Sequence, residues 1–416
     1  MSQRGELLTP SSDVSEKVRD FYDRHPYPPP IENLEKYQRH WQYERRRADF
    51  RLFWPDRAYR EDQSILIAGC GTSQAAKHAL RWPAAGVTGI DCSATSVCHT
   101  ERLKKQYDLK NLQVFQLAIE QAGELGMSFD QVVCTGVLHH LADPEAGLAA
   151  LRSVLKLGGA MQLMVYAPYG RTGIYMLQEF CRRVGIRADH EGIRDLNHAL
   201  GALPPGHPLQ TLLAQSPELR NEAALADALL HPQDRAYSVP QFLDLIEKAG
   251  LIFGRWMRQA PYSVHCGVIT KIPKVGEIAR LPLREQYAAI ELFRGTMIRH
   301  TAIVYRDDCT SLQRFDCLED DWLDYVPIRM PDTVCIQDRV PPPAAAVLVN
   351  RTHTYNDLFL TIGGTEKKVF DAIDGQRTIG DIAEKVLSSA DRGTYLNTNN
   401  FFERLWWHDQ VVFETN

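Results

Sequence analysis

Short apolar runs alternate with longer amphipathic segments between residues 64 and 166. Apolar runs separated by helical segments are typical of parallel strands that are buried on both faces of a sheet. The pattern therefore predicts an α/β fold with a doubly wound, mainly parallel sheet. Strands are expected at Ser64–Ala68, Val87–Asp91, Leu112–Leu117, Phe129–Thr135 and Ala160–Tyr166, and helices at Ser73–Leu80, Ala94–Tyr107 and Pro144–Leu155.

Two further segments flank this alternating core. Residues 1–60 begin polar and then become helical and aromatic up to a proline cluster at 26–30, which ends the helix because proline removes donors. Residues 167–239 contain helical pieces, and an insertion at that point overhangs the carboxyl edge of the sheet, where ligands bind in such folds. We therefore expect an amino-terminal helical flap over a ligand site and a lid insertion.

The domain that contains the lid is expected to span residues 61–272. Within it, a helix at Pro240–Ala249 is followed by strand patterns at Leu251–Met257 and Val264–Lys271. Residues 273–340 change periodicity and are predicted to be a helical linker, and residues 341–416 a mostly helical accessory domain. The expected elements of that domain are strands at Ala344–Val349 and Gln410–Phe413 and helices at Gly364–Ile373, Gly380–Leu387 and Asn399–His408.

The charge balance narrows the range of partners. The chain has 47 Lys and Arg residues against 52 Asp and Glu residues, a net charge of −5, which does not favour broad binding to a nucleic-acid backbone. The densest basic run, Arg45–Arg47, is expected to be a solvated helix face. We therefore expect no nucleic-acid partner.

Cysteine usage and hydropathy bear on the compartment. The nine cysteines form no C-x-x-C pair, so no metal site is predicted. The chain has no apolar run of membrane-spanning length, and its polar start has no signal-peptide core. We expect a reduced, cytoplasmic protein without membrane contact.

The first predicted strand ends in Gly69-Cys70-Gly71 and opens into a helix. Glycines at such a turn let the backbone approach a ligand, and the N–H groups of the helix start face that ligand. The continuation Thr72-Ser73-Gln74 does not complete a GxGxxG pattern, which disfavours a pyrophosphate cradle.

The segment Ile65–Gln74, followed by Gly89–Asp91 and Phe129–Pro144, resembles the class I S-adenosylmethionine (SAM)-dependent methyltransferases. The resemblance covers mainly residues 60–170. It implies a Rossmann-like methyltransferase domain with S-adenosyl-L-methionine as its cofactor.

Two positions depart from the family pattern. The family usually has an acid where Ile67 stands and a third glycine where Ser73 stands. Gln74 is the candidate to take over part of the missing polar network. These departures keep a non-catalytic relative of the family open as an alternative.

The resemblance also implies how the cofactor lies. Asp91 should accept hydrogen bonds from both ribose hydroxyls, since a carboxylate accepts two at once; capping of a helix near Ser93 is the alternative. The other implied contacts are Gly69, Cys70 and Gly71 with the methionine portion, Cys92, Ser93, Ile119 and Glu120 with the adenine, and Thr135 and Gly136 with the sulfonium and the substrate.

Catalytic residues are harder to identify, because methyl transfer needs a general base only when the nucleophile arrives protonated. The candidates near the expected mouth of the site are His139, Tyr22, Tyr27 and Tyr169. Ordinary helix and proline packing is the alternative for Tyr22 and Tyr27, and a buried structural histidine is the alternative for His139.

Residues 366–383 predict a helix, a glycine stop and a second capped helix. This part loosely resembles winged-helix modules that recognise peptides and the regulatory region of bacterial protein methyltransferases. DNA binding is disfavoured, because residues 366–416 carry six basic and nine acidic residues. A dimerisation or lid domain without a recognition role stays open.

These observations favour SAM-dependent methyl transfer to a protein or peptide side chain. The alternatives are a small-molecule N- or O-methyltransferase and a non-catalytic SAM-binding or interaction protein. The expected partner is therefore a protein, peptide or small-molecule methyl acceptor, and a homodimer stays open.

Overall fold

The computed structural model describes residues 10–215, 219, 221–309, 320–340, 342–386 and 392–415. Parts of the predicted segments lie outside the described residues, among them 1–9 of the flap, 310–319 of the linker and Leu387 at the end of a predicted helix. The chain divides into two compact units whose boundaries do not coincide with the predicted ones. The first unit is Met1–His40, Glu61–Phe253 and Arg294–Thr310, and the second is Trp41–Arg60, Gly254–Phe293 and Ser311–Asn416.

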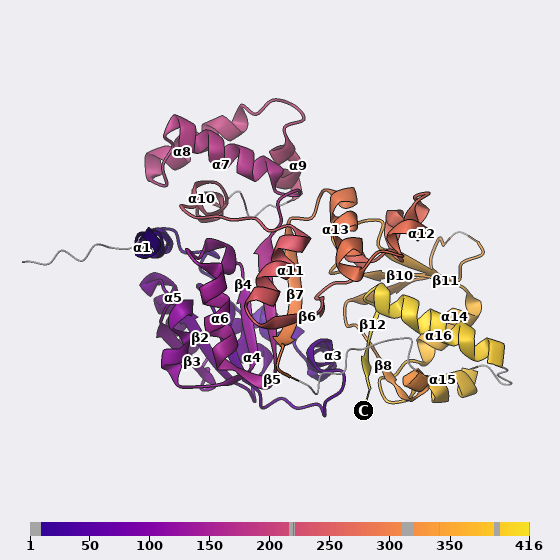
Figure 1. Ribbon diagram of the computed structural model, residues 1–416. Coiled ribbons are helices and arrows are strands. Elements are labelled where there is room, and N and C mark those ends of the chain that lie inside the picture. The colour runs from indigo at the N-terminus through magenta and orange to yellow at the C-terminus, as the bar shows by residue number, and fades with distance from the viewer. Residues whose placement is uncertain are drawn as a thin grey trace, which may run out of the picture. The chain divides into compact units, whose positions relative to one another are not determined.

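A seven-stranded sheet forms the centre of the first unit, in the order β3-β2-β1-β4-β5-β7-β6. Strands β1 to β5 pair in parallel and β7 runs antiparallel to β5. This arrangement confirms the predicted doubly wound, mainly parallel fold (Figure 1). The strands are β1 Ser64–Ala68, β2 Gly86–Asp91, β3 Leu112–Gln116, β4 Phe129–Thr135, β5 Leu155–Tyr166, β6 Leu251–Trp256 and β7 Arg299–Arg306.

The strand predicted at Val264–Lys271 is wrong. Two short 3-10 turns, Ala260–Tyr262 and Gly267–Lys271, occupy this region. Gly267 has φ +72°, and the carboxylate of Asp357, 89 residues later, accepts the N–H of Val268 at 2.8 Å, so a long-range hydrogen bond holds the backbone away from an extended path.

The last strand of the sheet comes instead from Arg299–Arg306, inside the predicted helical linker. Its Ala302, Ile303 and Val304 are fully buried, because this strand lies between β5 and β6. Because charged residues stand at both of its ends, the apolar run is too short to be recognised as a strand from the sequence pattern.

Helices cover the sheet and the carboxyl ends of its strands. The lid segment is helical, as its pattern suggested, and packs around its own apolar cluster, which includes Ile174, Leu177 and Leu225. Figure 1 shows these lid helices beyond the ends of the strands. The helices are α1 Pro10–Arg24, α2 Glu35–His40, α4 Gln74–Arg81, α5 Ala94–Gln106, α6 Pro144–Val154, α7 Thr172–Val184, α8 His190–Gly201, α9 Pro208–Gln215, α10 Glu222–Leu230 and α11 Val239–Lys248.

The second unit combines helices with two small sheets, so it is less helical than predicted. The order of the larger sheet is β11-β10-β9, and β12 pairs with β8. The three predicted carboxy-terminal helices are present, and the winged-helix likeness stays a prediction. The elements are α3 Tyr43–Phe53, α12 Val275–Ile278, α13 Leu283–Arg294, β8 Val326–Arg329, β9 Thr333–Ile336, β10 Ala346–Asn350, β11 Phe359–Ile362, α14 Gly364–Ala372, α15 Ile379–Val386, α16 Arg392–Trp407 and β12 Val411–Glu414. In the described part of the chain, no helix is both long and apolar enough to span a membrane.

The basic run on α3 is not the solvated helix face that its sequence suggested. Arg45 makes a two-pronged ion pair with Asp332, at 2.8 and 3.1 Å, and Arg47 pairs with Glu414 at 2.6 Å. Arg51, whose side chain is fully buried, also pairs with Glu414. Within the second unit, these contacts attach α3 to strand β12 and to the turn between β8 and β9.

We predict that Glu414→Gln lowers the free energy of unfolding of the second unit by about 3 kcal/mol, because it leaves the buried Arg51 charge without its anion. Denaturant unfolding of the full chain measures the change. The control Asp13→Asn removes an exposed ion pair with Lys17 and should leave the midpoint unchanged. Equal stability of the two variants would contradict this role for Glu414.

Candidate active site

A cavity of about 350 Å³ opens at the carboxyl ends of the central strands of the first unit. This size lies in the range of small-molecule sites, about 300–1,000 Å³. Strand order reverses around β1, and ligands bind at such switch points in α/β sheets. The cavity is lined by these residues predicted from the sequence: Tyr22, Tyr27, Gly69, Gly71, Gln74, Asp91, Cys92, Ile119, Glu120, Thr135 and Gly136.

The turn after β1 has no room for side chains. Gly69 and Gly71 have φ of +69° and +53°. A Cβ on Gly69 would lie 2.4 Å from a methyl group of Val137, and one on Gly71 would lie 2.9 Å from the Tyr27 carbonyl oxygen. The backbone of this turn is therefore exposed to a ligand without an intervening side chain. Cys70 is fully buried and does not line the cavity.

Asp91, the last residue of β2, ties this turn to the helix that follows. Its Oδ2 accepts the Gly71 N–H at 2.8 Å, and its Oδ1 accepts the Ser93 N–H at 2.9 Å. Burial raises the pKa of Asp91 to about 6, although these two hydrogen bonds act in the opposite direction. Because each carboxylate oxygen has a further lone pair, Asp91 can also accept hydrogen bonds from the cavity.

Ser93 has a structural role. Its Oγ accepts the Ser96 N–H at 3.1 Å as the cap of α5 and donates to Asp23 at 2.7 Å. Ser93 is buried and does not line the cavity. The helix cap considered for Asp91 is therefore supplied by Ser93.

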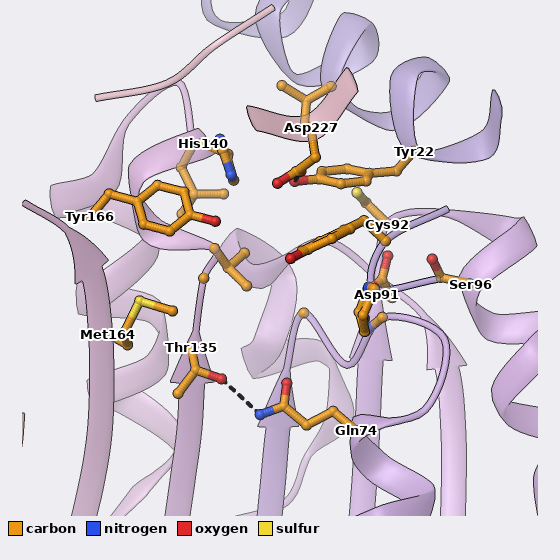
Figure 2. Close-up of a pocket in the computed structure, with 18 of the residues that line it drawn as sticks. Tyr22, Gln74, Asp91, Cys92, Ser96, Thr135, His140, Met164, Tyr166 and Asp227 are labelled. Carbon is orange, nitrogen blue, oxygen red and sulfur yellow. Dashed lines mark hydrogen bonds between the residues drawn. The ribbon is translucent and has the colours of Figure 1, made fainter. Parts of the chain in front are cut away.

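The missing family acid leaves an apolar position. Ile67 is fully buried within β1. Gln74, the first residue of α4, lines the cavity, and its amide donates to the Thr135 hydroxyl at 2.7 Å (Figure 2). That bond fixes the orientation of the amide, so its carbonyl oxygen points away from Thr135 and can accept a hydrogen bond from a ligand.

The structure buries His139, the predicted candidate, and brings the neighbouring His140 to the cavity. His139 has no exposed surface, and its ring packs on Tyr166 with ring centroids 4.1 Å apart. His140 lines the cavity instead, and its Nδ1 lies 2.7 Å from the Gln233 carbonyl oxygen. The β4-to-α6 turn therefore directs His140, not the predicted His139, toward a ligand.

Tyr22, Tyr166 and Asp227 form a polar corner with His140 at the lid side of the cavity (Figure 2). The Tyr22 hydroxyl donates to Asp227 Oδ1 at 3.0 Å. Asp227 is 3% exposed, and burial raises its pKa. The predicted Tyr169 is exposed and lies outside the lining.

Sequence reasoning missed Asp227, although a signal was present. Asp227 is the only charged residue in the apolar run 223–230 of the lid. A lone carboxylate in such a run is costly unless it has a partner or a function. The partner, Tyr22, lies 205 residues earlier in the chain, which sequence periodicity does not reveal.

Distances alone would allow a metal ion at His140, Asp227 and His231, whose ligand atoms lie within 4.8 Å of one another. However, His231 Nδ1 accepts the Gln233 N–H at 3.0 Å, so a neutral His231 carries its proton on Nε2. A metal at Nε2 would require that proton to move to Nδ1 and break this hydrogen bond. The donor set therefore fits a metal poorly.

Comparison with known proteins identifies the domain. Residues 66–161 match a family described as "Methyltransferase domain". "Uncharacterized protein syc1184_c" of Synechococcus sp. is 33% identical over 58% of this chain and 59% of its own length. "Ubiquinone biosynthesis O-methyltransferase" of Xanthomonas axonopodis pv. citri is 37% identical over 24% of this chain and 41% of its own. The chain spans less than two thirds of these relatives.

A "tRNA U34 carboxymethyltransferase" of Shewanella amazonensis is 34% identical over 24% of this chain and 31% of its own. Among solved structures, PKMT2 from Rickettsia typhi shares the fold, with a TM-score of 0.64 and 14% identity over 94% of this chain and 78% of that one. A second structure of PKMT2 is a complex with AdoHcy. Residues 66–161 of this chain therefore form a methyltransferase domain.

We predict that Asp91→Ala weakens the binding of S-adenosylhomocysteine (AdoHcy) at least about tenfold, because the ribose hydroxyls lose charge-assisted hydrogen bonds. Calorimetric titration measures the Kd, and a thermal melt verifies folding. Cys98→Ala, which changes an exposed residue outside the lining, is the control. Unchanged affinity in folded Asp91→Ala protein would remove Asp91 from the site.

The affinity for AdoHcy should also depend on pH. The ionised carboxylate is the stronger acceptor, and the pKa of Asp91 in the free protein is about 6. The affinity is therefore full above that pH and falls as the pH drops through 6. We expect the Kd to rise at least about threefold from pH 7.5 to 5.0. In Asp91→Asn the affinity should be weak and should lack this pH step; a step of equal size there would assign it to another group.

Proposed function

We propose that this chain, which contains a methyltransferase domain, transfers the methyl group of SAM to an amino group of a protein or peptide side chain. One observation carries the proposal: a single cavity joins the glycine turn and Asp91 to the buried corner of Tyr22, His140 and Asp227. The first part suits the cofactor, and the second suits a polar acceptor that approaches from the lid side.

The residues of the cofactor half fit SAM. The side-chain-free turn at Gly69 and Gly71 admits the methionine portion, Asp91 takes the ribose hydroxyls, and the Gln74 carbonyl oxygen can accept from the amino group. When bound, SAM supplies a methyl group on a sulfonium, which is a good leaving group. The protein then has to align and desolvate the acceptor.

The acceptor half suits a cationic amine. Asp227 places a carboxylate in the cavity wall, and the aromatic rings of Tyr22 and Tyr27 line the same cavity. Carboxylates and aromatic faces both attract ammonium groups, most strongly where water is excluded. The corner at Asp227 therefore favours an amine, and Arg171, a buried cation of the same cavity wall, is paired with Asp234 at 3.7 Å.

One feature supports a protein or peptide over a free metabolite. Residues 366–416 are more acidic than basic, which complements a lysine-containing segment. A small-molecule acceptor is the second candidate, supported by the similarity to the ubiquinone biosynthesis O-methyltransferase.

The proposal is tested with the full-length protein and methyl-tritiated SAM. Three acceptor pools are offered separately: lysine-containing peptides with lysate proteins, a low-molecular-mass extract, and tRNA. We expect label in the first pool that depends on Asp91. Label confined to the extract or to tRNA would contradict a protein or peptide acceptor. A protein that binds neither SAM nor AdoHcy would contradict SAM-dependent methyl transfer.

We predict that Asp227→Asn lowers kcat/KM for a peptide amine about 100-fold or more, because the acceptor ammonium loses its buried counter-charge. The Kd for AdoHcy should change less than about twofold, since Asp227 lies in the acceptor half. Asp195→Asn, an exposed carboxylate on lid helix α8, is the matched control. A kcat/KM equal to that of the control would place the acceptor elsewhere.

A further inference from the structure

We propose that His140 is the general base of the reaction, taking the proton of the acceptor amine on Nε2, and that the backbone of Gln233 holds it in the tautomer this requires. The proposal rests on the proposed function, since it concerns the acceptor end of the same cavity. The predicted candidates His139, Tyr22, Tyr27 and Tyr169 are not needed for this step.

The tautomer of His140 follows from its partner. Its Nδ1 lies 2.7 Å from the Gln233 carbonyl oxygen, and a carbonyl oxygen can only accept. Nδ1 therefore carries the proton, and Nε2 of the neutral ring keeps a lone pair. Within the described residues, Nε2 has no hydrogen-bond partner, and His140 belongs to the cavity wall.

Gln233 orients two rings at once. Its carbonyl oxygen holds His140, and its N–H donates to His231 Nδ1 at 3.0 Å. The two rings lie with centroids 3.8 Å apart and planes tilted by 33°. His140 is thus fixed on one side by stacking and at Nδ1 by a hydrogen bond, which leaves Nε2 as its free edge.

Burial and position distinguish His140 from the neighbouring His139 and His231. Burial lowers the pKa of His139 and that of His231 well below their ordinary range, so both stay neutral. Only His140 both lines the cavity and has the Asp227 carboxylate close by, with their ligand atoms within 4.8 Å. The geometry therefore selects His140, which faces the cavity with Asp227 beside it.

The chemical step balances without a further reactant. The acceptor ammonium gives one proton to His140 Nε2 and becomes a neutral amine. The amine nitrogen then forms a bond to the methyl carbon while the carbon–sulfur bond breaks, and that electron pair stays on sulfur. The products are a methylated ammonium and neutral AdoHcy, and His140 releases its proton to solvent before the next turnover.

The first test needs no acceptor. In the full-length protein with AdoHcy and ¹⁵N-labelled histidine, the His140 ring signals are assigned by their loss in His140→Gln. We expect the tautomer with the proton on Nδ1 at neutral pH. A ring protonated on Nε2 would overturn the proposal.

The second test is kinetic and uses the peptide amine pool with SAM. His140→Gln should lower kcat about 100-fold, the usual size of a general-base effect, while the Kd for AdoHcy stays within about twofold. Added imidazole should restore part of the lost rate in His140→Ala, because it can enter the space left by the ring and take the proton. The matched control is His198→Gln, the same change at an exposed histidine of lid helix α8 outside the cavity lining, with near-normal kcat.

The outcomes separate the two proposals. The assignment of His140 as the base is overturned if the wild type turns over normally and kcat is unchanged in His140→Gln, or if imidazole does not rescue a slow His140→Ala. Either result leaves the proposed function intact. Normal AdoHcy binding without wild-type turnover on any acceptor contradicts the proposed function and, with it, the assignment of His140 as the general base. Thermal melts of each variant identify losses that come from unfolding.

Discussion

The site depends on one buried carboxylate. Asp91 accepts the backbone N–H groups of Gly71 and Ser93, and so holds the turn after β1 and the start of α5 in one fixed arrangement. Keeping this charge away from water is costly, as the pKa of about 6 indicates. The two N–H groups offset part of that cost. A ligand with paired hydroxyls would offset more of it, so the same group that organises the turn also favours its occupant.

Local motifs were readable from the sequence, and contacts between distant segments were not. The strands β1 to β5 and the residues Gly69, Asp91 and Thr135 follow from runs and turns a few residues long, so their predictions agree with the structure. Strand β7 lies between β5 and β6 although charged residues flank its apolar centre. Asp227 and Tyr22 meet across 205 residues, and periodicity carries no information about such a contact. The choice of His140 over His139 depends on the hydrogen bond to Gln233, which only the folded chain shows.

The two halves of the cavity thus differ in origin. The cofactor half comes from the strand ends of one continuous motif, whereas the acceptor half is assembled from α1, the turn after β4 and lid helix α10. Changes in the lid can therefore alter the acceptor without disturbing the cofactor cradle.

We expect the methyl group to be delivered toward the corner formed by Tyr22, His140 and Asp227. This direction can be observed in a crystal structure with sinefungin, a SAM analogue that carries an amine near the position of the transferred methyl group. The adenosine hydroxyls should lie on Asp91, and the amine of the analogue should face Asp227 and His140. An amine that points away from this corner, or an adenosine bound outside the β1 and β2 ends, would contradict it.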